Sequence, residues 1–258
     1  MSNTTIETRE LTKVYRQGHV LAVDSLNTRI HKGEIFGLLG ENGAGKTTTV
    51  RMLTTMIKPT HGTAEVIGFD ILDDPNEVRE IVGVLPQDSG LYLELTVREN
   101  LEFFAKLQGI GDRETVDDRV GHLLELIEME DRSEVQAETL SGGLQRRVQL
   151  ARALIASPKV VFFDEPTSGL DVLVARKVRN LIRHLAREEN VTVVLCTHNM
   201  YDASRLCDRV LIMNRGQEVE KGTPREIVAK YKDIDGIEDF EDVVIHLIGG
   251  DVLEGIYD

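Results

Sequence analysis

The sequence predicts an α/β fold built on a mainly parallel sheet. Strand-like and helix-like segments alternate through much of the 258-residue chain, which is typical of parallel strands joined by crossover helices. A glycine-rich loop, from Gly40 to Thr47, follows one predicted strand and precedes a predicted helix. That context is the one in which such a loop binds phosphate groups. The first segments of the chain and a helical stretch in its middle depart from the alternation.

The first two strands are expected to form an antiparallel pair, because 5–15 and 21–30 flank a short polar turn around Gln17-Gly18. This pair predicts an N-terminal antiparallel β subdomain. An apolar strand over 34–39 then leads into the glycine loop, and a helix is expected over 47–56. Two further strands are predicted at 62–67 and 81–85.

From 96 to about 156 the strand signals disappear. Apolar residues recur at helical spacing here, as in Val97, Leu101 and Phe104, and again from Val120 to Ile127. The region therefore predicts an inserted helical subdomain.

Buried strands are expected again at 160–163 and 191–196, on either side of an amphipathic helix over 174–188. Strands at 209–213 and 218–220 close the predicted sheet, and Thr223-Pro224 is typical of a helix start. Residues 1–232 are thus expected to form one nucleotide-binding domain.

Residues 233–258 contain many acidic residues and no Lys or Arg. We interpret them as a short, partly solvated acidic appendage without chemistry of its own. The apolar run at 243–248 predicts a strand within it.

The composition excludes several classes of protein. A net charge of −14 argues against a nucleic-acid partner or a general attraction to anionic lipid. Cys196 and Cys207 have no metal or disulfide spacing, which favours two reduced thiols in a cytoplasmic protein. We expect no signal peptide and no membrane-spanning segment, because no apolar run is long enough. Any membrane role must then come through a partner.

The glycine loop carries the first chemical signal. Successive backbone N–H groups in such a loop can point at phosphate oxygens, and the following helix N-terminus adds positive potential. Lys46 is expected to bridge the β- and γ-phosphates of a nucleotide, and Thr47 to supply a hydroxyl to Mg²⁺. The alternative is a glycine-rich turn with a chance lysine, which the strand–loop–helix context disfavours.

The second signal is the apolar strand that ends in Asp164 and Glu165. Asp164 is expected to order Mg²⁺, and Glu165 to orient or deprotonate an attacking water. Such a pair alone is more often a solvated turn, but the glycine loop in the same chain favours hydrolysis. Together the two motifs predict a P-loop NTPase core.

With these motifs in place, the chain from about residue 5 to residue 231 resembles the nucleotide-binding subunit of an ATP-binding cassette (ABC) transporter. Besides the two motifs above, the resemblance rests on Tyr15, Gln87, the signature Leu140-Ser-Gly-Gly143, the D-loop Ser168-Gly-Leu-Asp171 and His198. It implies that Tyr15 stacks on adenine, that Gln87 contacts Mg²⁺ and the membrane partner, and that His198 is the catalytic switch. The implied ATP-binding residues are Tyr15, Gly40, Asn42, Gly43, Ala44, Gly45, Lys46, Thr47, Thr48, Ser141, Gly142, Gly143 and Asp171.

The signature departs from the family pattern at one place, because Leu144 precedes Gln145 where the pattern usually has glutamine first. This puts any contact of Leu144 with nucleotide in doubt. The resemblance further implies a head-to-tail dimer of two cassettes around two ATP molecules, for which a homodimer is expected. It also implies a separate transmembrane permease, which would hold the chain on the inner face of the cell membrane.

The transport direction and the partner leave alternatives. The segments 99–104 and 197–200 are similar to subunits of drug, antibiotic or sodium exporters, although importers share the core motifs. The alternative function is a soluble ABC ATPase of iron–sulfur cluster assembly. Whether the surface from Gln87 to Phe104 docks a membrane protein or a soluble scaffold distinguishes the two.

Overall fold

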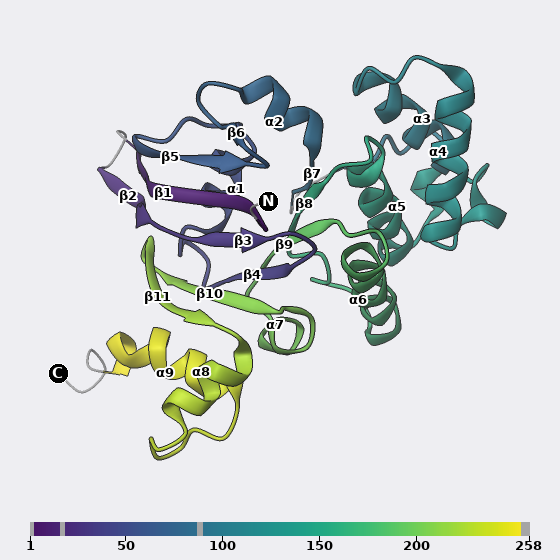
Figure 1. Cartoon of the computed structure of the whole chain (residues 1–258). Helices are drawn as coiled ribbons and strands as arrows, with labels where there is room; N and C mark the ends of the chain where they lie inside the picture. The colour runs from purple at the N-terminus through teal and green to yellow at the C-terminus, as the bar shows by residue number, and fades with distance from the viewer. Residues whose placement is uncertain (1–2, 16–18, 87–89, 254–258) are drawn as a thin grey trace.

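The computed structural model describes residues 3–15, 19–86 and 90–253. These residues form two β-sheets, and the first contains only antiparallel pairs (Figure 1). Its strands are β1 (Thr4–Tyr15), β2 (Val20–Leu26), β3 (Arg29–His31), β5 (His61–Val66) and β6 (Phe69–Asp70). The predicted antiparallel start of the chain is confirmed, although the expected strand over 21–30 is divided into β2 and β3.

The second sheet is the predicted, mainly parallel one. Its order is β11 (Gln217–Gly222), β10 (Arg209–Asn214), β4 (Ile35–Leu39), β9 (Thr192–Thr197), β8 (Val160–Asp164) and β7 (Val82–Leu85). Every pair is parallel except β10 with β11. Along β8, Val161 and Phe163 belong to one buried core and Phe162 to the other. Helices or strands therefore cover both faces, as expected for a parallel sheet.

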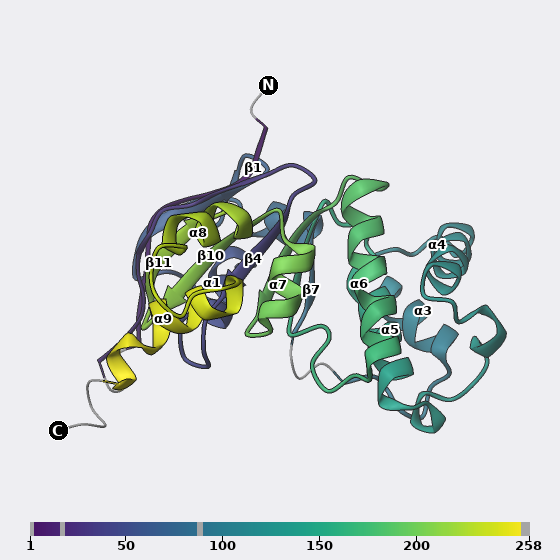
Figure 2. The same ribbon diagram turned by 90° about the horizontal axis from the view of Figure 1, so that it is seen from below.

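The region predicted to be helical consists of α3 (Val97–Leu107), α4 (Arg113–Leu126) and α5 (Gly142–Leu154), with two short 3₁₀ turns, Glu130–Arg132 and Ala137–Thr139. Figure 1 shows these three helices grouped on the right, away from the antiparallel sheet. The remaining helices are α1 (Lys46–Leu53), α2 (Pro75–Ile81), α6 (Val172–Arg187), α7 (Met200–Leu206), α8 (Pro224–Tyr231) and α9 (Phe240–Leu253). Figure 2 shows α6 between α7 and the group of α3, α4 and α5.

Side-chain caps fix where several helices begin. Thr96 and Thr223 each form a capping box, with Glu99 and Glu226 respectively. Each box satisfies two backbone N–H groups that a helix start leaves unpaired. Pro224 stands in the first turn of α8, so the helix predicted from Thr223-Pro224 is confirmed.

The strand predicted at 243–248 is wrong, because this run lies within α9. Asp239 Oδ1 accepts the backbone N–H groups of Glu241 and Asp242 at 2.8 and 3.1 Å, which favours a helix start. The buried residues recur at helical rather than alternate spacing: Phe240, Val243, Val244 and Ile248. Through them α9 packs onto the core around α7 and α8.

The sequence did not predict α2 and α7. Each has only seven residues, which is too short for a helical period to stand out from its surroundings.

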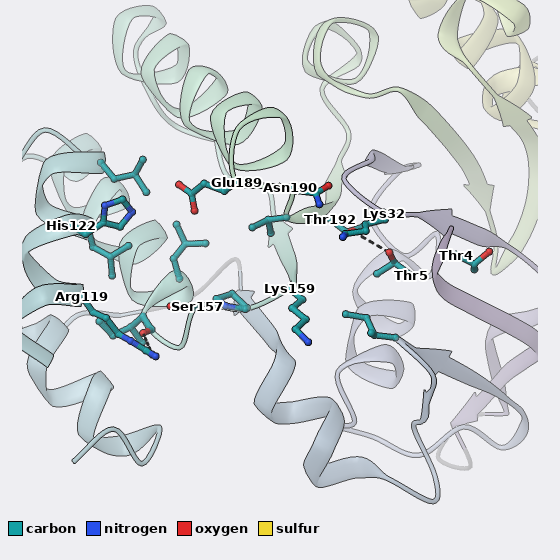
Figure 3. A pocket seen from close by; sticks show the side chains of 17 residues that line it. Thr4, Thr5, Lys32, Arg119, His122, Ser157, Lys159, Glu189, Asn190 and Thr192 are labelled. Carbon is teal, nitrogen blue, oxygen red and sulfur yellow. Dashed lines mark hydrogen bonds between the residues drawn. The ribbon is translucent and has the colours of Figure 1, made fainter. Parts of the chain in front are cut away.

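The two ends of the parallel sheet have different surroundings. The carboxyl ends of β4, β8 and β9 lead directly into Gly40, Glu165 and His198. The amino ends of β8 and β9 border a cavity of about 590 Å³ beside α4 (Figure 3). Among the helices of the described ranges, none combines the length and low polarity needed to cross a membrane.

Candidate functional site

The glycine loop links β4 to α1 and requires glycine at two positions. Gly40 has a φ of +149° and Gly45 a φ of +107°. A Cβ atom would lie 2.3 Å from Met213 O at Gly40, and 2.5 Å from Ala22 O at Gly45. Both contacts are far too close for a side chain. The loop therefore curls tightly ahead of α1, whose N-terminal N–H groups favour an anion.

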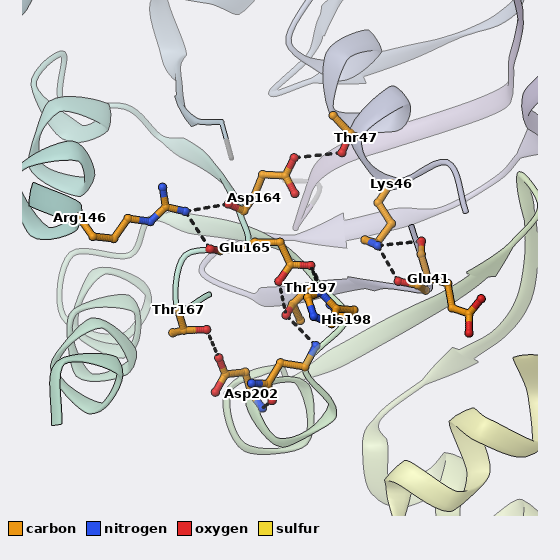
Figure 4. A network of polar contacts seen from close by, with 12 residues as sticks. Glu41, Lys46, Thr47, Arg146, Asp164, Glu165, Thr167, Thr197, His198 and Asp202 are labelled. Atoms are coloured by element: carbon orange, nitrogen blue, oxygen red, sulfur yellow. Dashed lines mark hydrogen bonds and ion pairs between the residues drawn. The ribbon is translucent and has the colours of Figure 1, made fainter. Parts of the chain in front are cut away.

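Lys46 lies over this loop and is buried. Its Nζ donates to the carbonyl oxygens of Gly40 and Glu41, at 2.5 and 3.1 Å (Figure 4). A cavity of about 450 Å³ opens beside the ammonium group. Predicted residues that line it are Tyr15, Asn42, Gly43, Gly45, Lys46, Thr47 and Thr48.

Gly40 and Ala44, also predicted to bind nucleotide, do not line this cavity. They contribute to the loop's backbone instead: Ala44 O accepts the N–H of Gly216 at 3.0 Å. Arg215 lines the cavity from the turn after β10, and the sequence analysis missed it. A positively charged residue in the short turn between two predicted strands was the available signal.

Thr47 and Asp164 meet across the site. Thr47 Oγ1 donates to Asp164 Oδ2 at 3.0 Å. Burial raises the pKa of the Asp164 carboxyl, and the hydrogen bond from Thr47 partly opposes that rise. A hydroxyl and a carboxylate side by side are the hard oxygen donors that Mg²⁺ prefers, with water completing its shell. These two residues thus fit the ion that the sequence analysis expected.

Glu165 follows Asp164 with a φ of +48° and is 6% exposed. Its carboxylate accepts Thr197 Oγ1–H at 3.1 Å and the backbone N–H of His198 at 2.9 Å. The Nδ1 atom of the His198 ring lies 2.6 Å from Glu165 Oε1. The structure therefore brings Glu165 and His198, two of the three predicted catalytic residues, into direct contact; the third, Gln87, lies outside the described residues.

Arg146 is a site residue that the sequence analysis missed. This buried guanidinium of α5 donates to the carbonyl oxygens of Asp164, Glu165 and Pro166, at 2.9, 2.8 and 3.2 Å. Burial lowers its pKa, an effect that the negative charges of Asp164 and Glu165 oppose. The available signal was a charge on the buried face of the helix, four residues before Leu150.

The sequence analysis also missed a set of hydrogen-bonded residues next to the D-loop in the chain, centred on Asp202. The buried carboxylate of Asp202 accepts Thr167 Oγ1–H and, at 2.9 Å, Arg179 Nη1–H. Asn199 caps α7, the helix that contains Asp202, by accepting the N–H of Asp202 at 3.1 Å. These bonds tie the loop after β8 to α6 and to the loop after His198.

The signature residues stand apart from the glycine loop. Ser141 is the N-cap of α5, with Gly142 and Gly143 in the first turn, and Asp171 is the N-cap of α6. None of the four lines the 450 Å³ cavity. The structure therefore divides the predicted nucleotide-binding residues into two separate sets. Gln87, the remaining predicted residue, lies outside the described residues.

Comparisons with known proteins identify the family of the chain. The family described as "ABC transporter" matches residues 23–168. The bacitracin transport ATP-binding protein BcrA of Bacillus licheniformis is 37% identical, over 85% of this chain and 70% of that protein. A Nod factor export ATP-binding protein I of Ralstonia nicotianae is 38% identical, over 88% and 70% respectively.

The fold is similar to that of the dimeric ATP-binding cassette MJ0796, solved in a post-hydrolysis state with ADP and Pi. The TM-score is 0.76 and the sequence identity 28%, over 84% of this chain and 98% of the other. The family match spans more than half of the chain, and it includes the glycine loop, the signature and the Asp164-Glu165 pair. The chain therefore belongs to the ABC transporter family and is an ATP-binding ATPase of that family.

Proposed function

We propose that this chain is the ATP-hydrolysing subunit of an ABC exporter, that it dimerises around two ATP molecules, and that it drives a separate membrane permease. One observation carries the proposal. The chain has a compact set of hydrolytic residues around Lys46 and Glu165, but its Ser141 signature lies outside that cavity. A second copy placed head to tail supplies the missing half of each site.

Each residue then has a task. Lys46 turns from the loop carbonyls to the nucleotide phosphates, and Glu165, held by His198 and Thr197, orients the attacking water and accepts its proton. Thr47 and Asp164, with Gln87 as the family resemblance implies, would hold Mg²⁺, and the ion would supply charge neutralisation at the phosphates. Ser141 and the start of α5 offer a hydroxyl and N–H groups to the γ-phosphate bound by the other copy.

An aromatic cluster near α3 supports the permease as a partner. The rings of Tyr92 and Phe103 have centroids 4.7 Å apart, and Phe104 lies 5.6 Å from Phe103. Tyr92 and Leu93 are both exposed. We infer that this cluster receives a cytoplasmic segment of the permease, which places the chain on the inner face of the membrane. The export direction is supported by the name of the Nod factor relative.

A co-purification experiment tests the proposal. A tagged Glu165→Gln chain is expressed in its native host, solubilised in mild detergent with ATP and Mg²⁺, and its partners are identified by mass spectrometry. We expect a polytopic membrane protein, and a Tyr92→Ser, Phe103→Ser variant should lose it. Co-purification of a soluble iron–sulfur scaffold, with no membrane protein bound to the tagged chain, would overturn the transporter assignment.

A further inference from the structure

The larger of the two cavities described above lies away from the glycine loop. It has a volume of about 590 Å³ and borders the amino ends of β8 and β9, whereas Asp164 ends β8 and His198 directly follows β9. A five-residue strand such as β8 separates the two sites by roughly 17 Å. The cavity is therefore distinct from the ATP site, and it lies at the amino ends of strands whose carboxyl ends carry that site.

The walls of this cavity come from segments that are far apart in the sequence. Helix α4 contributes Leu123 and Leu126, while the loops that precede β8 and β9 contribute Ile155 and Val191. The cavity has both an apolar wall and a polar one, and its volume is within the range that is typical of small-molecule sites. A ligand here would touch both the helical group and the parallel sheet.

The charged groups around the cavity are mostly basic. Lys32, Arg119, His122 and Lys159 line it, and Glu189 is the one carboxylate among its described lining residues. Figure 3 shows that Arg119 and His122 come from α4 on one side, and the two lysines from the core on the other. The whole chain has a net charge of −14, so this local excess of cations runs against the background.

The two lysines of the cavity have no protein partner for their charges among the described residues. Within the described residues, the Nζ atoms of Lys32 and Lys159 make no hydrogen bond or ion pair. Glu189 is engaged by His184, whose Nε2 lies 3.3 Å from Glu189 Oε1. Arg119 is fixed in the wall, because its Nη1 donates to Ile155 O at 3.2 Å. The lysine charges are therefore available to an anion.

We propose that this cavity binds a small amphipathic organic anion. Its carboxylate or phosphate group is held by Lys32 and Lys159, and its apolar part packs toward α4 against Leu123, Leu126 and Val191. Such a ligand joins α4 to the amino ends of the strands whose other ends carry Asp164 and Glu165. The inference does not depend on the proposed transport function, because it requires no ATP and no permease.

Methyl-resolved NMR tests the proposal on the full chain. Protein with ¹³C-labelled Ile, Leu and Val methyl groups is titrated with octanoate. We expect saturable shifts confined to the cavity, with Leu123, Leu126 and Val191 among the largest. The double variant Lys32→Gln, Lys159→Gln should raise the Kd by about tenfold, since it removes charge-assisted hydrogen bonds. The matched control Lys58→Gln, Lys232→Gln changes two exposed lysines elsewhere and should leave the Kd unchanged.

The parts of the proposal can fail separately. Absent or scattered methyl shifts, or an unchanged Kd in the cavity variant, would overturn the site. Equal affinity for uncharged octanamide would overturn the requirement for an anion. Equal affinity for inorganic phosphate would overturn the apolar half of the ligand. The methyl spectrum also reports the fold of each variant, so lost binding is not confused with unfolding.

Discussion

His198 contacts Glu165 through both its backbone and its ring. Its N–H donates to Glu165 Oε1 at 2.9 Å, and its Nδ1 atom lies 2.6 Å from the same oxygen. Thr197 holds the other carboxylate oxygen. The carboxylate that directly follows β8 is thus oriented by two residues at the carboxyl end of β9.

Replacing Glu165 with Gln separates binding from hydrolysis. The amide keeps the size of the side chain and can still accept from the His198 N–H, but it is a poor proton acceptor. We expect ATP affinity within a factor of about two to three and a turnover reduced by about a hundredfold or more. Phosphate release and equilibrium binding of a labelled ATP analogue measure the two quantities.

Glu125→Gln, which changes an exposed carboxylate of α4, is the matched control and should hydrolyse ATP at the normal rate. Wild-type turnover in Glu165→Gln would show that the proton goes elsewhere.

Arg146 is expected both to stabilise the fold and to position the two carboxylates of the site. Replacing it with Met leaves the carbonyl groups of Asp164, Glu165 and Pro166 without their buried donor, at a cost of about 1–3 kcal/mol for each group that finds no water. We expect a lower urea midpoint by circular dichroism. ATP turnover should also fall at temperatures where the variant is still folded, because both carboxylates lose their backbone anchor.

The neighbouring Arg147 provides the control. It is partly buried on the same helix, but it donates to Ile127 O at 2.7 Å and approaches Glu128, away from the catalytic strand. Arg147→Met should therefore lower stability while the folded protein keeps its turnover. Equal losses of turnover in the two variants would contradict a specific role for Arg146.

Most of the fold could be predicted because its signals are local. The glycine loop between strand and helix, the apolar run before Asp164 and the proline after Thr223 each act through neighbouring residues. The run at 243–248 gave a wrong prediction for the same reason, because five of its six residues are apolar and suit a strand locally. The cap from Asp239 and the packing of α9 against α7 and α8 select the helix.

The site residues that belong to a local sequence motif, such as Lys46 and Glu165, could be predicted together with their chemical roles. Arg146, Asp202 and Arg179 act through contacts with residues 18 to 35 positions away. Such contacts depend on how helices cross the sheet ends, which no single segment encodes. Of these three residues, only Arg146 had a local signal for its role, which was its charge on a buried helix face.

The raised pKa of Asp164 predicts how stability depends on pH. Burial is the main cause, so the folded protein binds a proton at this carboxyl more readily than the unfolded chain, whose carboxyl has an ordinary pKa near 3.8. Without nucleotide or metal, the ionised group therefore costs stability above its folded pKa. This cost shrinks as the pH falls below the folded pKa and is absent below the unfolded pKa.

Asp164→Asn removes this cost and keeps an oxygen that can accept from Thr47. We expect the variant to have a higher urea midpoint than the wild type at pH 7.5, and the difference to shrink as the pH is lowered. Asp118→Asn, at an exposed position of α4, should show no such trend. A less stable Asp164→Asn at pH 7.5, or a difference independent of pH, would contradict the burial of an unfavourable charge.

Ser141 tests the head-to-tail dimer, because it is exposed and does not line the cavity of its own glycine loop. In the Glu165→Gln background, Ser141→Arg should bind ATP normally and elute as a monomer in size-exclusion chromatography with ATP and Mg²⁺. The long side chain would occupy the space that the γ-phosphate of the other copy needs.

Ser141→Ala removes the N-cap hydroxyl, which accepts the Leu144 N–H at 3.4 Å, without adding bulk. It should lose about 1 kcal/mol of stability and still dimerise at a higher ATP concentration. A Ser141→Arg protein that dimerises as readily as its parent would mean that the start of α5 does not face the nucleotide of a second copy. The completion of each site would then have to come from another surface.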